Sequence, residues 1–206
     1  LVGILLFTIV SFLWLPPLTW FIIFSIGILA FLINDKSTLK ISLCSFIIVL
    51  IYSSIPTSIN ELVIYSPYQK LTLQTLNSGI PNIRTTDRYY QNLHNLDSKI
   101  SSAFSTNRPD TLKYINHIGQ SYALPYYFQK QPKEVLILAS GAGNDVAAAL
   151  ANQAKNIDAV EIDPVIQKMG SAVHPQAPYS SKKVNIFIDD ARAFLKKINK
   201  KYDLII

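Results

Sequence analysis

Residues 135–163, VLILASGAGNDVAAALANQAKNIDAVEID, decide the fold of this chain. An apolar run leads into a turn of small residues at 139–143, an alanine-rich segment follows, and a second apolar run ends on Glu161. A strand, a glycine turn, a helix and a second strand that ends on an acid about twenty residues later are typical of a nucleoside-cofactor site. Glycines let the backbone approach a ligand closely, and the acid can accept hydrogen bonds from both ribose hydroxyls. The stretch therefore predicts where this protein binds its cofactor.

The same alternation of strands and helices continues to residue 206. It predicts strands at 135–139, 157–161, 184–188 and 202–206, and helices at 144–154, 164–172 and 190–198. Strands that alternate with helices of this length form a parallel sheet covered on both faces. We therefore expect an α/β, Rossmann-like domain over residues 131–206. Ligands of such sheets bind at the carboxyl ends of the strands, where Gly141, Gly143, Glu161 and Asp190 should converge.

The glycine turn differs from that of a dinucleotide-binding site. The fingerprint G-x-G-x-x-G requires a third glycine that lets helix and strand pack closely, and this chain has Val146 there. Asp190, after the third strand, suits recognition of an adenine amino group. A glycine turn, a ribose acid and an adenine acid together resemble the S-adenosylmethionine-type methyltransferase fold. Methyltransferases of this fold usually carry an acid two residues before the turn, and Ile137 in that position argues against an ordinary methyltransferase.

Several motifs add a more specific resemblance. The chain contains SPYQKL at 66–71, VLILASGAGND at 135–145, AVEIDP at 159–164, IDDARAFL at 188–195 and KYDLII at 201–206. With these motifs it resembles the spermidine synthase (polyamine aminopropyltransferase) family, particularly its membrane-anchored bacterial members. The likeness covers residues 61–76 and 133–206, whereas residues 77–130 match poorly.

The resemblance implies an enzyme that transfers an aminopropyl group to a diamine such as putrescine. The donor would be decarboxylated S-adenosylmethionine, or S-adenosylmethionine in a methyltransferase of the same fold, and no metal is expected. The residues expected to bind the cofactor are Gln69, Gly141, Gly143, Glu161 and Asp190. Tyr122 lies near the place of a family tyrosine that lines the substrate tunnel. Tyrosines 122, 126 and 127 could also be ordinary core residues, and residues 174–179 could cover the cofactor or serve as a plain connector.

At two positions that would act on the amine substrates, the sequence differs from the family or does not show the expected residue. The family turn reads GGGDGG, and its aspartate holds the amine of the aminopropyl group. Ala142 stands at that position, and the nearest acid is Asp145, which we expect to bind substrate instead. The catalytic acid of the family is expected beyond Ile206 and is unassigned here. Asp203 is either a substitute acid or a structural residue at the start of a strand. A catalytically degenerate relative is therefore a further alternative.

The first 56 residues are almost uncharged. They hold only Asp35, Lys36 and Lys40 as charges and contain apolar runs at 1–15, 18–34 and 41–52. About 20 apolar residues are needed for a membrane-spanning helix. We therefore predict two or three transmembrane helices in a lipid bilayer, and a multi-pass protein of a bacterial inner membrane.

Two sequence signals disagree on how these helices are oriented in the membrane. The two lysines in the short loop at 35–40 favour the cytoplasmic side for that loop, which would leave the soluble part outside. A cytosolic cofactor favours the inside, and on that chemistry we expect a cytoplasmic soluble domain. Because the chain starts inside an apolar segment and ends inside a predicted strand, we expect it to be part of a longer protein.

Residues 57–130 form a third region, predicted as a β-hairpin and tunnel-forming segment. Residues 61–76 alternate as strand, turn and strand, and hydrophobic helix faces occur at 87–100 and 110–123.

The charge of the soluble part excludes few classes of function. Residues 57–206 carry 17 Lys+Arg and 12 Asp+Glu, a mild positive excess. The lysine cluster at 196–201 is interpreted as a solvated helix face, so no nucleic-acid partner is expected. A homodimer is one alternative for the assembly. His94, His117 and His174 lack metal-ligand spacing.

Overall fold

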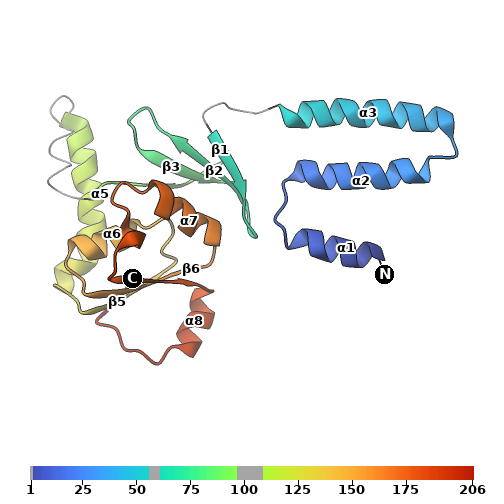
Figure 1. Cartoon of the computed structure of the whole chain (residues 1–206). Helices are drawn as coiled ribbons and strands as arrows, with labels where there is room; N and C mark the ends of the chain where they lie inside the picture. Colours follow the sequence, from blue (N-terminus) through green and yellow to red (C-terminus); the bar gives the residue numbers. More distant parts are fainter. Residues whose placement is uncertain (1, 56–60, 97–108) are drawn as a thin grey trace. The chain divides into compact units, whose positions relative to one another are not determined.

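A computed structural model describes residues 2–55, 61–96 and 109–206 (Figure 1). The chain divides into two compact units, Leu1–Glu61 and Leu62–Ile206. We describe each unit by itself.

The first unit consists of three apolar helices, α1 (Val2–Ser11), α2 (Pro17–Phe31) and α3 (Lys36–Ser54). Among the described helices, α3 alone is long and apolar enough to cross a membrane, and none of its 19 residues is buried. The 15 residues of α2 extend over about 22 Å at 1.5 Å per residue, which is short of the roughly 30 Å of a bilayer core. Two or three membrane-spanning helices were predicted, and one of the described helices, α3, has sufficient length.

The second unit begins with an antiparallel sheet in the order β1-β2-β3-β4. The strands are β1 (Glu61–Tyr65), β2 (Lys70–Thr75), β3 (Pro81–Thr85) and β4 (Arg88–Asn92). The predicted strand, turn and strand over 61–76 are confirmed. Between β1 and β2, the Ser66 hydroxyl accepts hydrogen bonds from the backbone N–H groups of Tyr68 (3.2 Å) and Gln69 (3.1 Å). The SPYQ motif is thus a serine-stabilised turn.

The predicted helix at 87–100 is wrong where the structure describes it. Residues 88–92 form β4, which pairs antiparallel with β3. Thr86 and Asp87, with φ of 48° and 64°, make the turn between the two strands. Two consecutive positive φ angles match the twist of a hairpin, but Thr-Asp is not a typical pair for this turn. The remainder of that prediction, from residue 97 onward, lies outside the described residues.

The helix predicted at 110–123 is confirmed and is longer, because α5 covers Pro109–Phe128. It leads into a four-stranded parallel sheet with the order β7-β6-β5-β8. The strands are β5 (Glu134–Leu138), β6 (Asn156–Glu161), β7 (Val184–Ile188) and β8 (Leu204–Ile205). The connecting elements are α6 (Asn144–Ala151), α7 (Pro164–Val173), the short 3-10 helix η1 (Pro178–Ser180) and α8 (Ala191–Lys197). The alternation expected from the sequence is confirmed.

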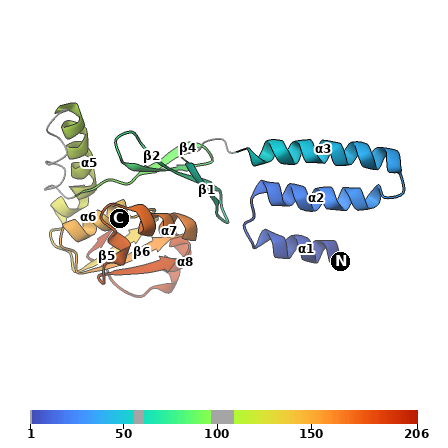
Figure 2. The same ribbon diagram turned by 45° about the horizontal axis from the view of Figure 1, so that its top comes forward.

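Helices cover both faces of this sheet (Figure 2). On one face, Val135 and Ile137 of β5 pack in a buried cluster with Val146 of α6. On the other face, Leu136 of β5 packs with Phe194 of α8. The side chains of a strand alternate between faces, so this split follows directly from the apolar run in β5. The fold is a mixed α/β arrangement with both faces of a parallel sheet buried.

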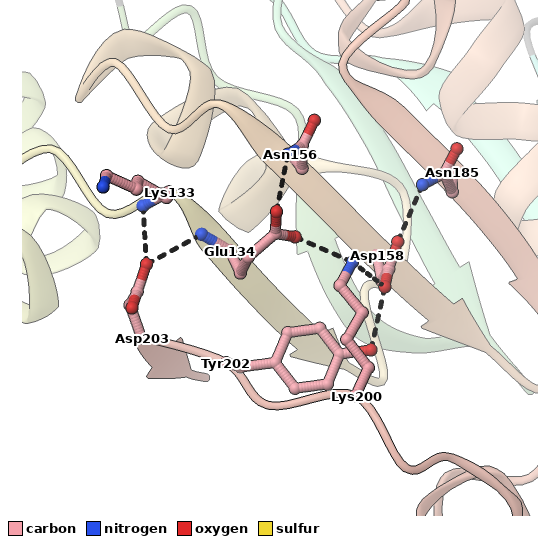
Figure 3. A network of polar contacts seen from close by, with 8 residues as sticks. All are labelled: Lys133, Glu134, Asn156, Asp158, Asn185, Lys200, Tyr202 and Asp203. Carbon is pink, nitrogen blue, oxygen red and sulfur yellow. Dashed lines mark hydrogen bonds and ion pairs between the residues drawn. The ribbon is translucent and has the colours of Figure 1, made fainter.

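A polar network ties the amino ends of the strands together (Figure 3). Asp158 of β6 is buried and accepts hydrogen bonds from Lys200 Nζ (2.7 Å), the Tyr202 hydroxyl (2.8 Å) and Asn185 Nδ2 (2.8 Å). Lys200 also pairs with Glu134 at 2.8 Å. The segment before β8 is thereby fixed directly to β5 and β6, and Asp158 joins it to Asn185 of β7.

Replacing Asp158 by asparagine should destabilise the second unit by about 2 kcal/mol at neutral pH. The change leaves Lys200 without its buried partner, and the usual penalty of roughly 3–5 kcal/mol is reduced because the Lys200 side chain is 34% exposed. Burial raises the pKa of Asp158, but the hydrogen bonds from Lys200, Asn185 and Tyr202 outweigh burial and hold it below its usual value. Urea unfolding of the wild type and the variant at pH 7 measures the difference.

A carboxyl whose pKa is lowered in the folded state stabilises the fold above its unfolded pKa, and this contribution is lost as the pH falls through the folded pKa. The difference between wild type and Asp158→Asn should therefore shrink below about pH 4. A difference that stays constant between pH 7 and strongly acidic solution would contradict the assignment.

Candidate functional site

The glycine turn lies at the carboxyl end of β5, where it leads into α6. Gly141 and Gly143 have φ of 57° and 104°, in the left-handed region that favours glycine. A Cβ on Gly143 would lie 2.9 Å from Pro178 and 3.0 Å from Tyr179. A Cβ on Gly141 would lie 3.1 Å from both Gln91 and Tyr90. Both glycines therefore have two roles. They allow the backbone to form the turn, and they leave room for side chains of β4 and of η1 to pack against it.

Glu161, at the carboxyl end of β6, lies directly against this turn. The side chain is 4% exposed, and its carboxylate accepts hydrogen bonds from the backbone N–H of Gly141 (2.7 Å) and of Asp163 (2.9 Å). A carboxylate offers about four acceptor sites, so further hydrogen bonds from a ribose can be accepted. The structure brings together the glycine turn and the acid that the sequence predicted to share one site.

Asp163 is a second buried acid at this strand end, and the sequence analysis did not assign it a ligand. One carboxylate oxygen caps α7 by accepting from the backbone N–H of Val165 at 2.9 Å. The other oxygen, Oδ2, is buried and has no hydrogen-bond partner among the described residues. A buried acceptor without a partner is costly. A ligand that carries hydroxyl donors would satisfy it.

Tyr90 and Gln91 of β4 are also close to the turn and were missed from the sequence. Gln91 Oε1 accepts a hydrogen bond from the backbone N–H of Ala142 at 3.0 Å. Burial, followed by the charges of Glu161 and Asp163, raises the pKa of Tyr90 to about 12. The mistaken helix prediction concealed these residues, since the hairpin at 86–87 is what delivers them to the site.

Asp190 and Gln69 complete the predicted cofactor residues. Asp190 follows β7, which pairs with β6 so that Ile188 lies opposite Glu161. One oxygen of Asp190 accepts from Ala193 N at 2.9 Å and caps α8. Gln69 lies in the SPYQ turn, and no hydrogen bond of the described residues joins it to Glu161 or to the glycine turn. The site therefore includes the ends of three neighbouring strands, with Gln69 outside its hydrogen-bond network.

Asp145 lies in the first turn of α6, near enough to three tyrosines for its charge to act on their hydroxyl groups. Burial raises the pKa of this carboxyl. Its charge in turn raises the pKa of Tyr122, Tyr126 and Tyr179, for which burial is the larger cause. Tyr126 is buried, and its hydroxyl has no hydrogen-bond partner within the described part of the chain. A partly buried carboxylate beside tyrosine rings is a suitable environment for an ammonium group.

Ala142 points away from this environment into the hydrophobic core. It is fully buried and packs with Leu71, Ile83 and Met169, among other apolar residues. Gly170 of α7 lies against its backbone: a Cβ on Gly170 would be 2.6 Å from the carbonyl carbon of Ala142. The position at which the resemblance leads us to expect an aspartate is thus a packing position in this chain.

The segment from His174 to Tyr179 contacts the glycine turn. The Tyr179 hydroxyl donates to the carbonyl oxygen of Gly141 at 2.7 Å and lies 3.0 Å from the Ser140 hydroxyl. The segment therefore packs against the glycine turn, and the alternative that it covers the cofactor stays a prediction.

Asp203 lies at the opposite end of the sheet. Its carboxylate accepts from the backbone N–H groups of Lys133 (2.7 Å) and Glu134 (2.9 Å), at the amino end of β5. Since Glu161 lies at the carboxyl end of the adjacent β6, the structural role expected for Asp203 fits and the role of substitute acid does not. Among the described residues, no group of three or more His, Cys, Asp or Glu side chains could hold a metal ion.

Comparisons with known proteins point to one family. Residues 114–206 match the spermine/spermidine synthase domain. The chain resembles the spermidine synthase family. A polyamine aminopropyltransferase of Thermoplasma volcanium is 30% identical over 86 residues, which are 40% of this chain and 32% of that relative. The chain therefore spans about a third of the length of this curated relative.

A solved spermidine synthase shares the fold. A spermidine synthase in complex with the transition-state analogue AdoDATO has a TM-score of 0.50 and 16% identity over 70% of this chain and 46% of that one. The spermidine synthase of Thermotoga maritima has a TM-score of 0.49 and 15% identity at the same coverage. The first likeness supports the Rossmann-like fold expected from the sequence.

Proposed function

We propose that this protein is an aminopropyltransferase that uses decarboxylated S-adenosylmethionine and a diamine such as putrescine. The observation that carries the proposal is the pairing of buried Glu161 with the glycine turn at Gly141, within a sequence that resembles spermidine synthases. Because the chain spans only part of those relatives, its activity and substrates are inferences from this site.

The residues at the strand ends fit the nucleoside part of the cofactor. Glu161 and the unpartnered Oδ2 of Asp163 would accept hydrogen bonds from the ribose hydroxyls, and Asp190 would accept one from the adenine amino group. Gly141, Gly143 and Gln69 would contribute to the same site. When bound, the cofactor supplies a three-carbon chain on a sulfonium, whose thioether is a good leaving group.

The amine-binding half differs from the pattern expected for the family. Asp145 would hold the ammonium group of the diamine, with Tyr122 and Tyr126 beside it, in place of the acid absent at Ala142. An aliphatic amine is protonated at neutral pH, with a pKa near 10.4, so it must lose a proton before it attacks. Asp145, whose carboxyl pKa is raised by burial, would accept this proton, and the amine nitrogen then bonds to the carbon as the thioether leaves.

The test is a turnover assay with the full-length protein. Decarboxylated S-adenosylmethionine and putrescine should give spermidine and methylthioadenosine in equal amounts, measured by mass spectrometry. A methylated product from S-adenosylmethionine would instead indicate a methyltransferase of the same fold. Nucleoside binding without turnover would indicate a catalytically degenerate relative, which the apolar surroundings of Ala142 favour as the second candidate.

We further propose that α3 lies in a lipid bilayer, as part of a bacterial inner-membrane anchor with the soluble unit in the cytoplasm. Ile41, Ile48 and Ile51 are 67%, 67% and 62% exposed, and a core helix of a soluble protein would bury such residues. The full-length protein should stay in the membrane pellet after alkaline carbonate washing. Release of intact protein into the wash would contradict the anchor.

A further inference from the structure

Asn144, the first residue of α6, is a buried hub between three elements of the second unit. It has no exposed surface. Its Oδ1 accepts from the backbone N–H of His94 (3.2 Å) and lies 3.1 Å from His174 Nε2. Its Nδ2 donates to the carbonyl oxygen of Asn92 (2.8 Å) and to the Tyr122 hydroxyl (2.9 Å). All four hydrogen-bonding positions of the amide are thus used.

The contacts of His174 determine the orientation of this amide. His174 Nδ1 accepts from the backbone N–H of Gln176 at 3.1 Å, so in the neutral ring the proton is on Nε2. Burial, and to a lesser extent the nearby His94, lowers the pKa of His174 to about 4, so the ring is neutral at physiological pH. The Nε2–H group therefore donates to Asn144 Oδ1.

The reverse orientation of the amide is excluded by its neighbours. It would place the Asn144 NH₂ group against two donors, the His94 N–H and the His174 Nε2–H. It would also place the amide oxygen against the carbonyl oxygen of Asn92. Each mismatch leaves a buried polar group unsatisfied. The Tyr122 oxygen consequently always receives a hydrogen bond from Asn144 and is fixed in position.

We propose that His174 and Asn144 are positioning residues that hold the Tyr122 hydroxyl beside Asp145, and that they thereby set the geometry of the amine-binding half of the site. This inference rests on the proposed function for its substrate. Asn144 and Asp145 are consecutive residues in the first turn of α6, so the same helix end carries the acid and holds the ring beside it. A small displacement of a positioned group is enough to weaken a site of this kind.

Two substitutions of His174 separate positioning from packing. In His174→Gln the amide nitrogen can occupy the place of Nε2 and keep the donor to Asn144. In His174→Asn the shorter side chain reaches only the place of Nδ1, and the donor is lost. We expect KM for putrescine to rise about tenfold in His174→Asn, the effect of one lost hydrogen bond, and to stay within about twofold in His174→Gln. Affinity for methylthioadenosine should be unchanged in both variants.

A double-mutant cycle with Tyr122→Phe provides the second readout. If His174 acts through the Tyr122 hydroxyl, His174→Asn should add no further rise in KM in the Tyr122→Phe background. Additive effects, or equal effects of the asparagine and glutamine variants, would overturn the proposal. Thermal unfolding of each variant identifies any loss of the fold.

The hydrogen-bond chain is testable without turnover. In the ¹⁵N NMR spectrum of the wild type, the His174 ring should show the proton on Nε2 at neutral pH, and His174→Asn should alter the environment of the Tyr122 ring. A proton on Nδ1 would overturn the proposal. Absence of spermidine formation with this NMR signature intact would count against the proposed function alone.

Discussion

Gly170→Ala is expected to destabilise the second unit by about 3 kcal/mol or more, and to displace the glycine turn. The added Cβ would lie 2.6 Å from the carbonyl carbon and 2.7 Å from the Cα of Ala142. These are backbone atoms at the centre of the turn, and they cannot rotate away as a flexible side chain can. Overpacking of this kind usually costs about 1–3 kcal/mol, and occasionally more. Chemical denaturation of the full-length variant measures the loss.

Gly119→Ala is the matched control, because Gly119 is also helical and a Cβ there would meet nothing within 4 Å. Alanine is favoured over glycine inside a helix by up to about 1 kcal/mol, so this variant should be slightly more stable than the wild type. Equal stability of the two variants would mean that α7 does not approach the glycine turn as closely as described.

Glu161→Gln is expected to reduce the affinity for methylthioadenosine about 100-fold. The glutamine NH₂ group would face the backbone N–H of Gly141 or of Asp163, both of which now donate to the carboxylate. The variant would also lose the charge that strengthens hydrogen bonds from the ribose, each worth roughly 1.5–3 kcal/mol. Equilibrium dialysis with the radiolabelled nucleoside measures the affinity of the full-length protein.

Asp189→Asn is the control for this effect. Asp189 lies at the end of the neighbouring strand, but its carboxylate pairs with Lys197 at 2.9 Å on the surface. Nucleoside affinity should remain within about twofold, since an exposed ion pair contributes little. If Glu161→Gln binds the nucleoside as tightly as this control, the ribose assignment is wrong.

The parallel sheet was predictable because each of its strands has a strong local signal. The apolar run at 135–138 leads into small residues, the mostly apolar strand at 157–160 ends on an acid, and Asp163-Pro164 begins a helix. The antiparallel sheet was only partly predictable. β4 contains two consecutive tyrosines, Tyr89 and Tyr90, which give no period-two signal of a strand, and the turn at Thr86 and Asp87 lacks glycine. Pairing with β3 decides the conformation there, and pairing is not a local property.

The residues of the site were likewise only partly predictable from the sequence. Glu161 and Gly141 were predictable because chain order places them at neighbouring strand ends. Asp163 precedes a proline, a pattern that indicates only a helix start, and the structure is needed to show that its second oxygen is buried without a partner among the described residues. The hub at Asn144 joins segments that lie 22 to 52 residues away, so no sequence motif could indicate it. The apolar role of Ala142 likewise depends on the approach of Gly170 from another helix.

The contact between Asp203 and the start of β5 bears on how the protein is made. Lys133 and Glu134 emerge from the ribosome about 70 residues before the carboxylate that accepts from their N–H groups. Until then, the central strand of the sheet has β6 on one side and an open edge on the other, and open edges of buried strands promote aggregation. Residues 203–206 are thus the ones that cover this open edge of β5 during synthesis.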